Sequence, residues 1–188
     1  MRFHHPSSDR VVRVGYCLNL HAAETLTDVR RAIESFSVPL RDRLAPDGES
    51  FGVGMYLAAG AARELREDPE ALRDLREFLR AQRIDPFTFN AFPYGGFQED
   101  GLKARVYQPN WMEAERVDYT VDVAWAAAGL VEASRDEPRM VSISTASCSS
   151  PRPATSNASE SGAREIFRAT LPSASFSRRS QITRLVTF

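Results

Sequence analysis

Membrane spans, disulfide patterns and an excess of one charge sign are all missing from this chain. No apolar run approaches the roughly 20 residues that a membrane span needs, and the N-terminal MRFHHPSSDR contains no apolar signal core. The two cysteines, Cys17 and Cys148, lie far apart and fit no CxxC pattern. A formal net charge of -1 gives no electrostatic basis for binding nucleic acid or an anionic membrane. These absences predict a cytoplasmic protein with no membrane span and no nucleic-acid partner.

Several motifs of nucleotide-binding proteins and hydrolases are also absent. The chain contains no P-loop, no GxGxxG fingerprint and no GxSxG elbow. Histidine is scarce, since only His4, His5 and His21 occur, and the first two belong to a polar N-terminal arm in which we interpret both as unpaired side chains. We therefore predict no complete metal site in this chain and leave its cofactors undefined.

The even charge balance conceals two regions of different composition. Residues 147–188 contain six Arg and two Glu, so they carry +4, and ten of these 42 residues are serine. The remaining 146 residues contain 18 basic and 23 acidic side chains and carry -5. Apolar periodicity is lost after residue 146. We therefore predict a folded unit over residues 1–146 and, over residues 147–188, a Ser/Arg-rich tail that is disordered or encoded out of frame.

Four short apolar runs in this chain predict β-strands. Residues 11–18 begin with β-branched side chains, and residues 51–57 contain two glycines that permit close approach of neighbouring backbones. Residues 87–90 place Phe87 and Phe89 at period 2 and end on a polar Asn90. Residues 140–145 alternate apolar side chains with serine. Helical spacing separates the runs, so the sequence predicts βαβ units, an α/β fold and a parallel sheet.

Helix signals lie between these predicted strands. Thr25 and Asp28 approximate a capping box, and Asp68 followed by Pro69 predicts the start of another helix. A further helix is expected over residues 111–133. The apolar faces predicted for the three helices are Leu26, Val29, Ile33, Phe36 and Leu40; Leu72, Leu75, Phe78 and Leu79; and Val117, Val121, Ala124, Trp125 and Ala128.

Four of these segments carry a resemblance to a known family. YCLNLH at residues 16–21, FGVGMYL at residues 51–57, FNAFPYGGF at residues 89–97 and SIST at residues 142–145 resemble motifs of the metabolite-traffic protein EboE family, in order and in spacing. That family is similar to the xylose-isomerase-like TIM barrels. The resemblance implies a partial (β/α)8 barrel of about four βα units, with the second half of the barrel missing. One departure is Ala91, where the family usually has glycine.

The resemblance also implies that functional side chains lie at the carboxyl ends of the strands. We assign His21 there as the candidate catalytic residue, acting as a proton shuttle or a hydrogen-bond donor. The candidate substrate-binding residues are Asn19, Asn90, Tyr94 and Thr145, because amides and hydroxyls bond sugar-like ligands and tyrosine offers an aromatic wall. The alternative roles are structural: a loop histidine bonded to backbone, an asparagine that caps a turn and a tyrosine packed over the barrel mouth.

Three hypotheses of function follow from the resemblance. In the first, the parent protein is a sugar isomerase or epimerase-like enzyme acting on a small polar metabolite, and a divalent metal ion is expected only in the complete barrel. In the second, the chain is a non-catalytic module that binds such a metabolite during biosynthesis or traffic. In the third, it is an inactive, truncated product. Because four strands leave two open edges, we also expect a partner chain that covers them.

Overall fold

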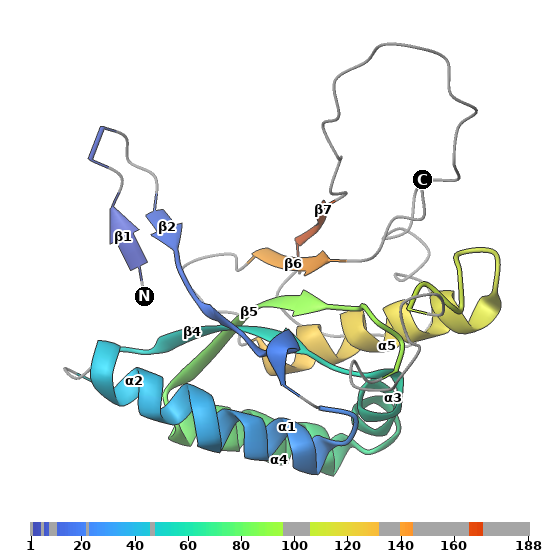
Figure 1. Ribbon diagram of the computed structural model, residues 1–188, viewed down its shortest axis with the longest axis horizontal. Helices are drawn as coiled ribbons and strands as arrows, with labels where there is room; N and C mark the ends of the chain where they lie inside the picture. The colour runs from blue at the N-terminus through green and yellow to red at the C-terminus, as the bar shows by residue number, and fades with distance from the viewer. Residues whose placement is uncertain are drawn as a thin grey trace.

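Strands and helices alternate along the chain and build a sheet with helices packed along it (Figure 1). The helices α1, α2 and α4 lie together on one side of the sheet in this view. The computed structural model describes the chain at residues 2–4, 6–7, 11–21, 23–45, 48–95, 106–131, 140–144 and 166–170.

The main sheet has five strands in the order β3–β4–β5–β6–β7. The first four run parallel: β3 (Tyr16–Cys17), β4 (Phe51–Tyr56), β5 (Ile84–Asn90) and β6 (Met140–Ser144). The fifth, β7 (Ile166–Thr170), pairs antiparallel with β6. The predicted α/β fold with a parallel sheet is therefore confirmed. Since parallel strands point the same way, the carboxyl ends of β3 to β6 share one edge of the sheet.

Strand β7 lies within the region predicted to be a tail. Its pairing with β6 runs from Thr170 opposite Met140 to Ile166 opposite Ser144. The loss of apolar periodicity after residue 146 did not predict this strand, which pairs with the outer edge of β6. Other residues of the predicted tail lie outside the described part of the chain.

The first predicted strand is divided into two strands that belong to different sheets. β2 (Val11–Arg13) pairs antiparallel with β1 (Arg2–His4), which lies in the segment described as a polar N-terminal arm, and only β3 joins the main sheet. Gly15 lies at the break. A Cβ there would lie 2.7 Å from the carbonyl oxygen of Gly52 and would also collide with the Phe87 ring. The chain can pass this point only with a glycine, because the backbone of β4 and a side chain of β5 occupy the space.

The first helical region begins at the predicted cap and contains a π turn. It consists of α1 (Leu26–Ala32), η2 (Ile33–Ser37) and α2 (Val38–Leu44). The Thr25 hydroxyl accepts a bond from the Asp28 N–H, and the Asp28 carboxylate accepts one from the Thr25 N–H. The predicted capping box is therefore confirmed.

The π turn changes which side chains face the core. Pro39 has no N–H to donate to a regular helix, and the wider turn of η2 ends two residues before it. Ser37 is buried, whereas Phe36 is 44% exposed. The prediction that Phe36 belongs to the core face is wrong, because the buried positions of the wide turn are Ile33 and Ser37.

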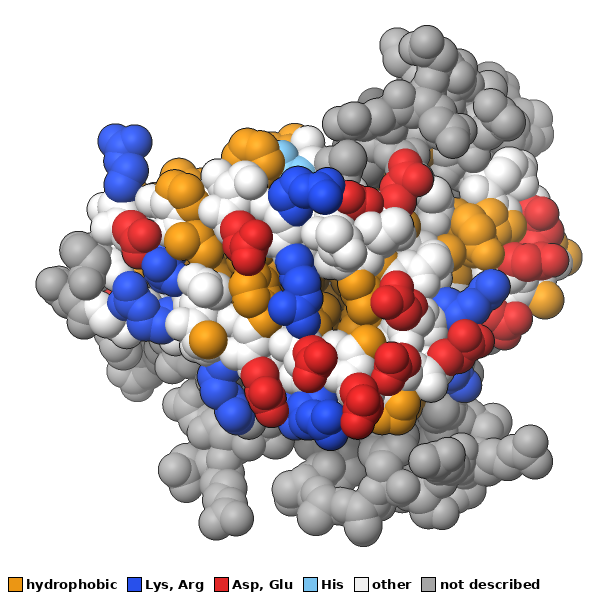
Figure 2. Space-filling model, turned by 90° about the horizontal axis from the view of Figure 1, so that it is seen from below, with side chains coloured by type: hydrophobic (Ala, Val, Ile, Leu, Met, Phe, Trp, Pro, Cys, Tyr) orange, Lys and Arg blue, Asp and Glu red, His pale blue; other side chains and the backbone are white. Residues whose placement is uncertain are grey.

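Helices α3 (Ala59–Glu67) and α4 (Pro69–Ala81) follow β4. The Asp68 carboxylate accepts two backbone N–H groups of the first turn of α4, which confirms the predicted start. Leu75 and Leu79 of the predicted stripe are buried, and its two other members pack against the core while partly exposed. Figure 2 shows acidic and basic side chains interspersed over the surface seen from below, with apolar side chains between them.

The buried face of α5 (Ala114–Leu130) differs from the predicted one. Val117 is 39% exposed, and the other members of the predicted stripe are only partly buried. The buried positions are instead Arg116, Tyr119, Asp122, Val123, Ala126, Ala127 and Leu130. The prediction of this face is wrong because three of these side chains are polar, and their polar atoms find partners inside the protein.

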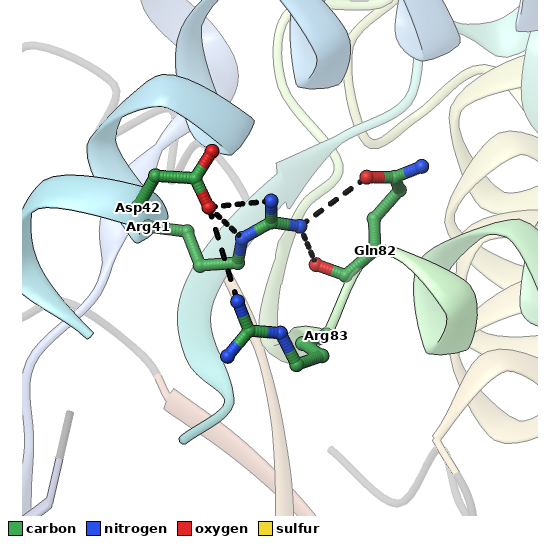
Figure 3. A network of polar contacts seen from close by, with 4 residues as sticks. All are labelled: Arg41, Asp42, Gln82 and Arg83. Carbon is green, nitrogen blue, oxygen red and sulfur yellow. Dashed lines mark hydrogen bonds and ion pairs between the residues drawn. The ribbon is translucent and has the colours of Figure 1, made fainter. Parts of the chain in front are cut away.

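A polar network surrounds Arg41 at the amino end of β5 (Figure 3). Its guanidinium donates to the backbone carbonyl and the side-chain oxygen of Gln82, two residues before β5 begins. It also donates to Asp42 through Nε at 2.9 Å and Nη2 at 2.6 Å. Arg83 Nη2 lies 3.8 Å from the same carboxylate oxygen. The network thus ties the end of α2 to the residues that lead into β5.

Candidate functional site

Small and polar side chains of three neighbouring strands meet at the carboxyl edge of the sheet. A Cβ at Gly54 of β4 would lie 2.9 Å from Thr88 Oγ1 and 3.6 Å from Cys17 Sγ. Across this glycine, Asn90 Nδ2 donates to Cys17 Sγ at 3.8 Å. Gly54 lies on the middle strand, so its missing side chain leaves room for groups from β3 and β5 to approach each other. These four residues form the candidate site.

A bulge in β5 directs Thr88 toward this site. The register with β4 shifts between Val53 and Gly54: Val53 lies opposite Pro86 and Gly54 opposite Thr88, so Phe87 is the extra residue of the bulge. The ring of Phe87 lies over Gly52 of β4 and over Gly15, whereas Phe89 is buried in the core. The predicted period-2 pattern of these two phenylalanines is therefore broken. Because of the extra residue, Phe87 and Thr88 are consecutive in sequence and yet lie on the same face of the sheet.

His21 belongs to a different cluster from Asn90. Its Nε2 lies 2.7 Å from the Tyr16 hydroxyl oxygen, and its ring stacks on Phe36 with centroids 3.7 Å apart and planes 7° apart. Tyr16 and Cys17 are consecutive strand residues, so their side chains leave opposite faces of the sheet. His21 is held on the Tyr16 side and Asn90 on the Cys17 side. The predicted catalytic and binding residues are thus not brought into one cluster.

Of the remaining loop candidates, Asn19 lies within the described residues and follows β3. Asn19 lies in the single turn η1 (Leu18–Leu20), directly after β3, and is partly buried. Thr145 lies outside the described residues. Its neighbour Ser144 ends β6 and pairs in register with Asn90. The end of β6 therefore lies beside the end of β5.

Tyr94 packs against two side chains of α5. Its ring meets the ring of Tyr119 edge-on, with centroids 5.2 Å apart, and the Arg116 guanidinium carbon lies 6.0 Å from its centre. The Tyr94 side chain remains partly exposed. One side of the ring is therefore packed as the structural alternative requires, while its exposed part remains available as a wall for a ligand.

The loop that carries Tyr94, residues 91–95, is held at four of its five backbone carbonyl groups. The donors come from α5, from the first residue of α3 and from the last residue of β4. The four contacts are Arg116 Nη1 to Ala91 O at 3.1 Å, Tyr119 Oη to Pro93 O at 2.9 Å, Ala59 N to Tyr94 O at 2.9 Å and Tyr56 Oη to Gly95 O at 2.5 Å.

Arg116 is nearly inaccessible to solvent, with 3% of its surface exposed. Besides Ala91, its guanidinium donates through Nε to Pro109 O at 2.7 Å, and it lies over the rings of Tyr94 and Tyr119. Burial lowers the pKa of Arg116, and the neighbouring tyrosines and Glu113 oppose that shift. Arginine still remains charged at neutral pH. Carbonyl dipoles and aromatic faces therefore stabilise a buried positive charge.

Burial also raises the pKa of the Tyr56 and Tyr119 hydroxyls above the ordinary value for tyrosine. The carboxylate of Glu24 adds to the shift at Tyr56. Both hydroxyls therefore stay protonated at neutral pH and can serve as donors. These two residues and Arg116 were not among the predicted site residues. The available signal was an Arg-x-x-Tyr pair at helical spacing and a tyrosine at the end of a buried strand.

Among the described residues, no group of three or more His, Cys, Asp and Glu side chains is arranged to hold a metal ion. Over the same part of the chain, no helix is long and apolar enough to cross a membrane. Comparison with protein-family models, with curated proteins and with solved structures finds no match to this chain. The resemblance to the EboE family therefore remains a prediction that rests on the motifs themselves.

Proposed function

We propose that this chain binds a small polar metabolite at the carboxyl ends of β3, β4 and β5. The observation that carries the proposal is the meeting of Cys17, Thr88 and Asn90 around Gly54. A thiol, a hydroxyl and an amide can donate and accept hydrogen bonds without a net charge, which suits a neutral, hydroxyl-rich ligand. The location also supports it, because open and closed parallel sheets bind ligands at the carboxyl ends of their strands.

The resemblance to the EboE family extends this proposal to the biosynthesis or traffic of the metabolite in the cytoplasm. In that view, β3 to β6 correspond to the first four strands of a xylose-isomerase-like (β/α)8 barrel. Four neighbouring parallel strands with helices between them support the correspondence. Strand β7 departs from it, because a barrel would place a parallel strand beside β6.

Within this proposal the described residues act by binding, and proton transfer by His21 has no part in it. The His21 ring is engaged by Tyr16 and stacked on Phe36, away from the Cys17 side of the sheet. An isomerase or epimerase activity would belong to a complete barrel with further acidic and histidine side chains. We therefore expect His21→Ala to leave metabolite binding by this chain unchanged.

Binding is tested by NMR titration of the purified chain with three neutral sugars, D-xylose, D-xylulose and D-ribulose. We expect a bound sugar to shift the amide signals of Cys17, Gly54 and Asn90. Asn90→Ala should weaken binding about fivefold, because loss of one hydrogen bond costs on the order of 1 kcal/mol. Thr27→Ala removes an exposed hydroxyl on α1 and serves as the control. Absence of binding by all three sugars, or equal affinities of the two variants, would contradict the proposal.

A further inference from the structure

We infer that Arg116 and Tyr119 are positioning residues, which hold the loop at residues 91–95 in place before any ligand arrives. The inference rests on the proposed function in one respect, namely that this loop follows Asn90 and carries Tyr94 beside the proposed site. That Arg116 and Tyr119 hold the loop does not depend on any ligand. The loop is then a fixed wall of the site, and it does not close over the ligand as a lid.

Tyr119 bridges the exits of two neighbouring strands. Its hydroxyl oxygen lies 2.6 Å from Leu57 O, one residue past β4, and 2.9 Å from Pro93 O, three residues past β5. The single hydroxyl hydrogen is shared between the two carbonyl oxygens. Because the Tyr119 ring on α5 is buried in the core, its hydroxyl has a fixed position. It therefore sets the separation between the two segments that leave the sheet beside the proposed site.

Arg116 fixes the same loop at its first residue. Its guanidinium joins Ala91 O to Pro109 O, and so connects the start of the loop with the segment that leads into α5. A planar guanidinium can donate in two directions at once, whereas a lysine ammonium is a point charge on a flexible stem. Without the guanidinium, two carbonyl oxygens lose their donors.

The structure also contains a reporter of the loop position. Ala59 is the first residue of α3, and the first N–H groups of a helix have no partner within that helix. The Ala59 N–H donates instead to Tyr94 O at 2.9 Å. Movement of the loop away from α3 would expose this N–H to water. The rate of its hydrogen exchange therefore measures how often the loop opens.

The experiment compares amide hydrogen exchange in the wild type, Tyr119→Phe and Leu79→Ala. Leu79 is buried on α4, so its truncation lowers global stability without touching the loop contacts. In Tyr119→Phe we expect Ala59 to exchange about tenfold faster, through local opening after loss of a hydroxyl donor. Amides of β4 should keep their wild-type rates in that variant. In Leu79→Ala, the β4 and Ala59 amides should accelerate together.

Conservative replacement at Arg116 provides a second measurement. Arg116→Lys retains the charge and one donor group, so we expect Ala59 to exchange more slowly in it than in Arg116→Met. The inference is overturned if Ala59 exchange in Tyr119→Phe and Arg116→Met follows global stability as it does in Leu79→Ala. If none of the three sugars binds, the proposed function fails, while Ala59 exchange still decides whether these residues position the loop.

Discussion

A buried arginine lies at each end of β5, and the two are stabilised in different ways. At the amino end, Arg41 is 8% exposed and donates to Gln82 O and to the carboxylate of Asp42. At the carboxyl end, Arg116 donates to carbonyl oxygens of two loops and lies over two aromatic rings. The charge of Arg41 is compensated by a carboxylate at the protein surface, whereas the charge of Arg116 is stabilised by carbonyl dipoles and aromatic rings in the interior.

The difference agrees with the separate roles of the two ends of a parallel sheet. In α/β barrels, residues at the amino ends of strands contribute to stability, and residues at the carboxyl ends contribute to function. Arg41 joins two parts of the scaffold, α2 and the residues before β5. Arg116 joins loops beside the proposed site. Substitutions at the two arginines should therefore differ both in their cost in stability and in their effect on binding.

The largest effect is expected for Arg116→Met. It removes charge-assisted hydrogen bonds to Ala91 O and Pro109 O, each worth about 1.5–3 kcal/mol. We expect the free energy of unfolding, measured by urea denaturation, to fall by about 3 kcal/mol. Arg116→Lys should recover part of this loss. A decrease below about 1 kcal/mol would show that the buried charge is not held by these carbonyls.

A smaller loss is expected for Arg41→Met. Gln82 O loses a donor, but Asp42 is about half exposed and is solvated once its partner is gone. We expect the free energy of unfolding to fall by about 2 kcal/mol in the same measurement. Sugar affinity and Ala59 exchange relative to β4 should remain at wild-type values. If Arg41→Met proved costlier than Arg116→Met, the contrast between the two ends of β5 would be reversed.

Asp122 on α5 is a buried carboxylate that is paired, like Arg41, with a side chain of opposite charge. Burial raises its pKa, although Arg66 Nη1 lies 3.0 Å from its Oδ1 and opposes the shift. Because the folded-state pKa exceeds the unfolded value of about 3.9, the folded state binds this proton more tightly. Its contribution to stability is therefore present below pH 4 and is lost as the pH rises through the folded pKa.

Asp122→Asn should remove this component of the pH dependence. Between pH 4 and pH 7, the free energy of unfolding should fall less with rising pH in the variant than in the wild type. Asp74→Asn, which removes an exposed carboxylate of α4 that has no influence on the pKa of Asp122, provides the control. Identical pH profiles of the wild type and Asp122→Asn would mean that Arg66 fully compensates the cost of burial.

Local features of the fold were predictable from the sequence, and pairings over long distances were not. The caps at Thr25 and Asp68 depend on backbone groups within three residues, so the sequence contains all the necessary information. Strand β2 separates from β3 because it pairs with β1, and β7 exists because it pairs with β6. Neither pairing leaves a pattern within the strand itself.

The candidate site was predicted in part for the same reason. A strand that ends on Asn90 before a loop placed that residue at the carboxyl edge, where the structure has it. The separation of His21 from Asn90 depends on the side from which Tyr16 and Cys17 leave β3. Arg116 and Tyr119 were missed because hydropathy assigns polar side chains to the surface, whereas here the hydrogen bonds that satisfy them come from loops distant in sequence.

The bulge at Phe87 has a consequence for how this sheet can change through evolution. Pro86 pairs with Val53 and Thr88 pairs with Gly54, so β5 would form an uninterrupted ladder if residue 87 were deleted. The phenylalanine is an insertion whose ring fills the space above Gly15 and Gly52. Loss of Phe87 would therefore relieve the contact above Gly52, whereas Gly15 would still be required, because a Cβ there lies 2.7 Å from the carbonyl oxygen of Gly52.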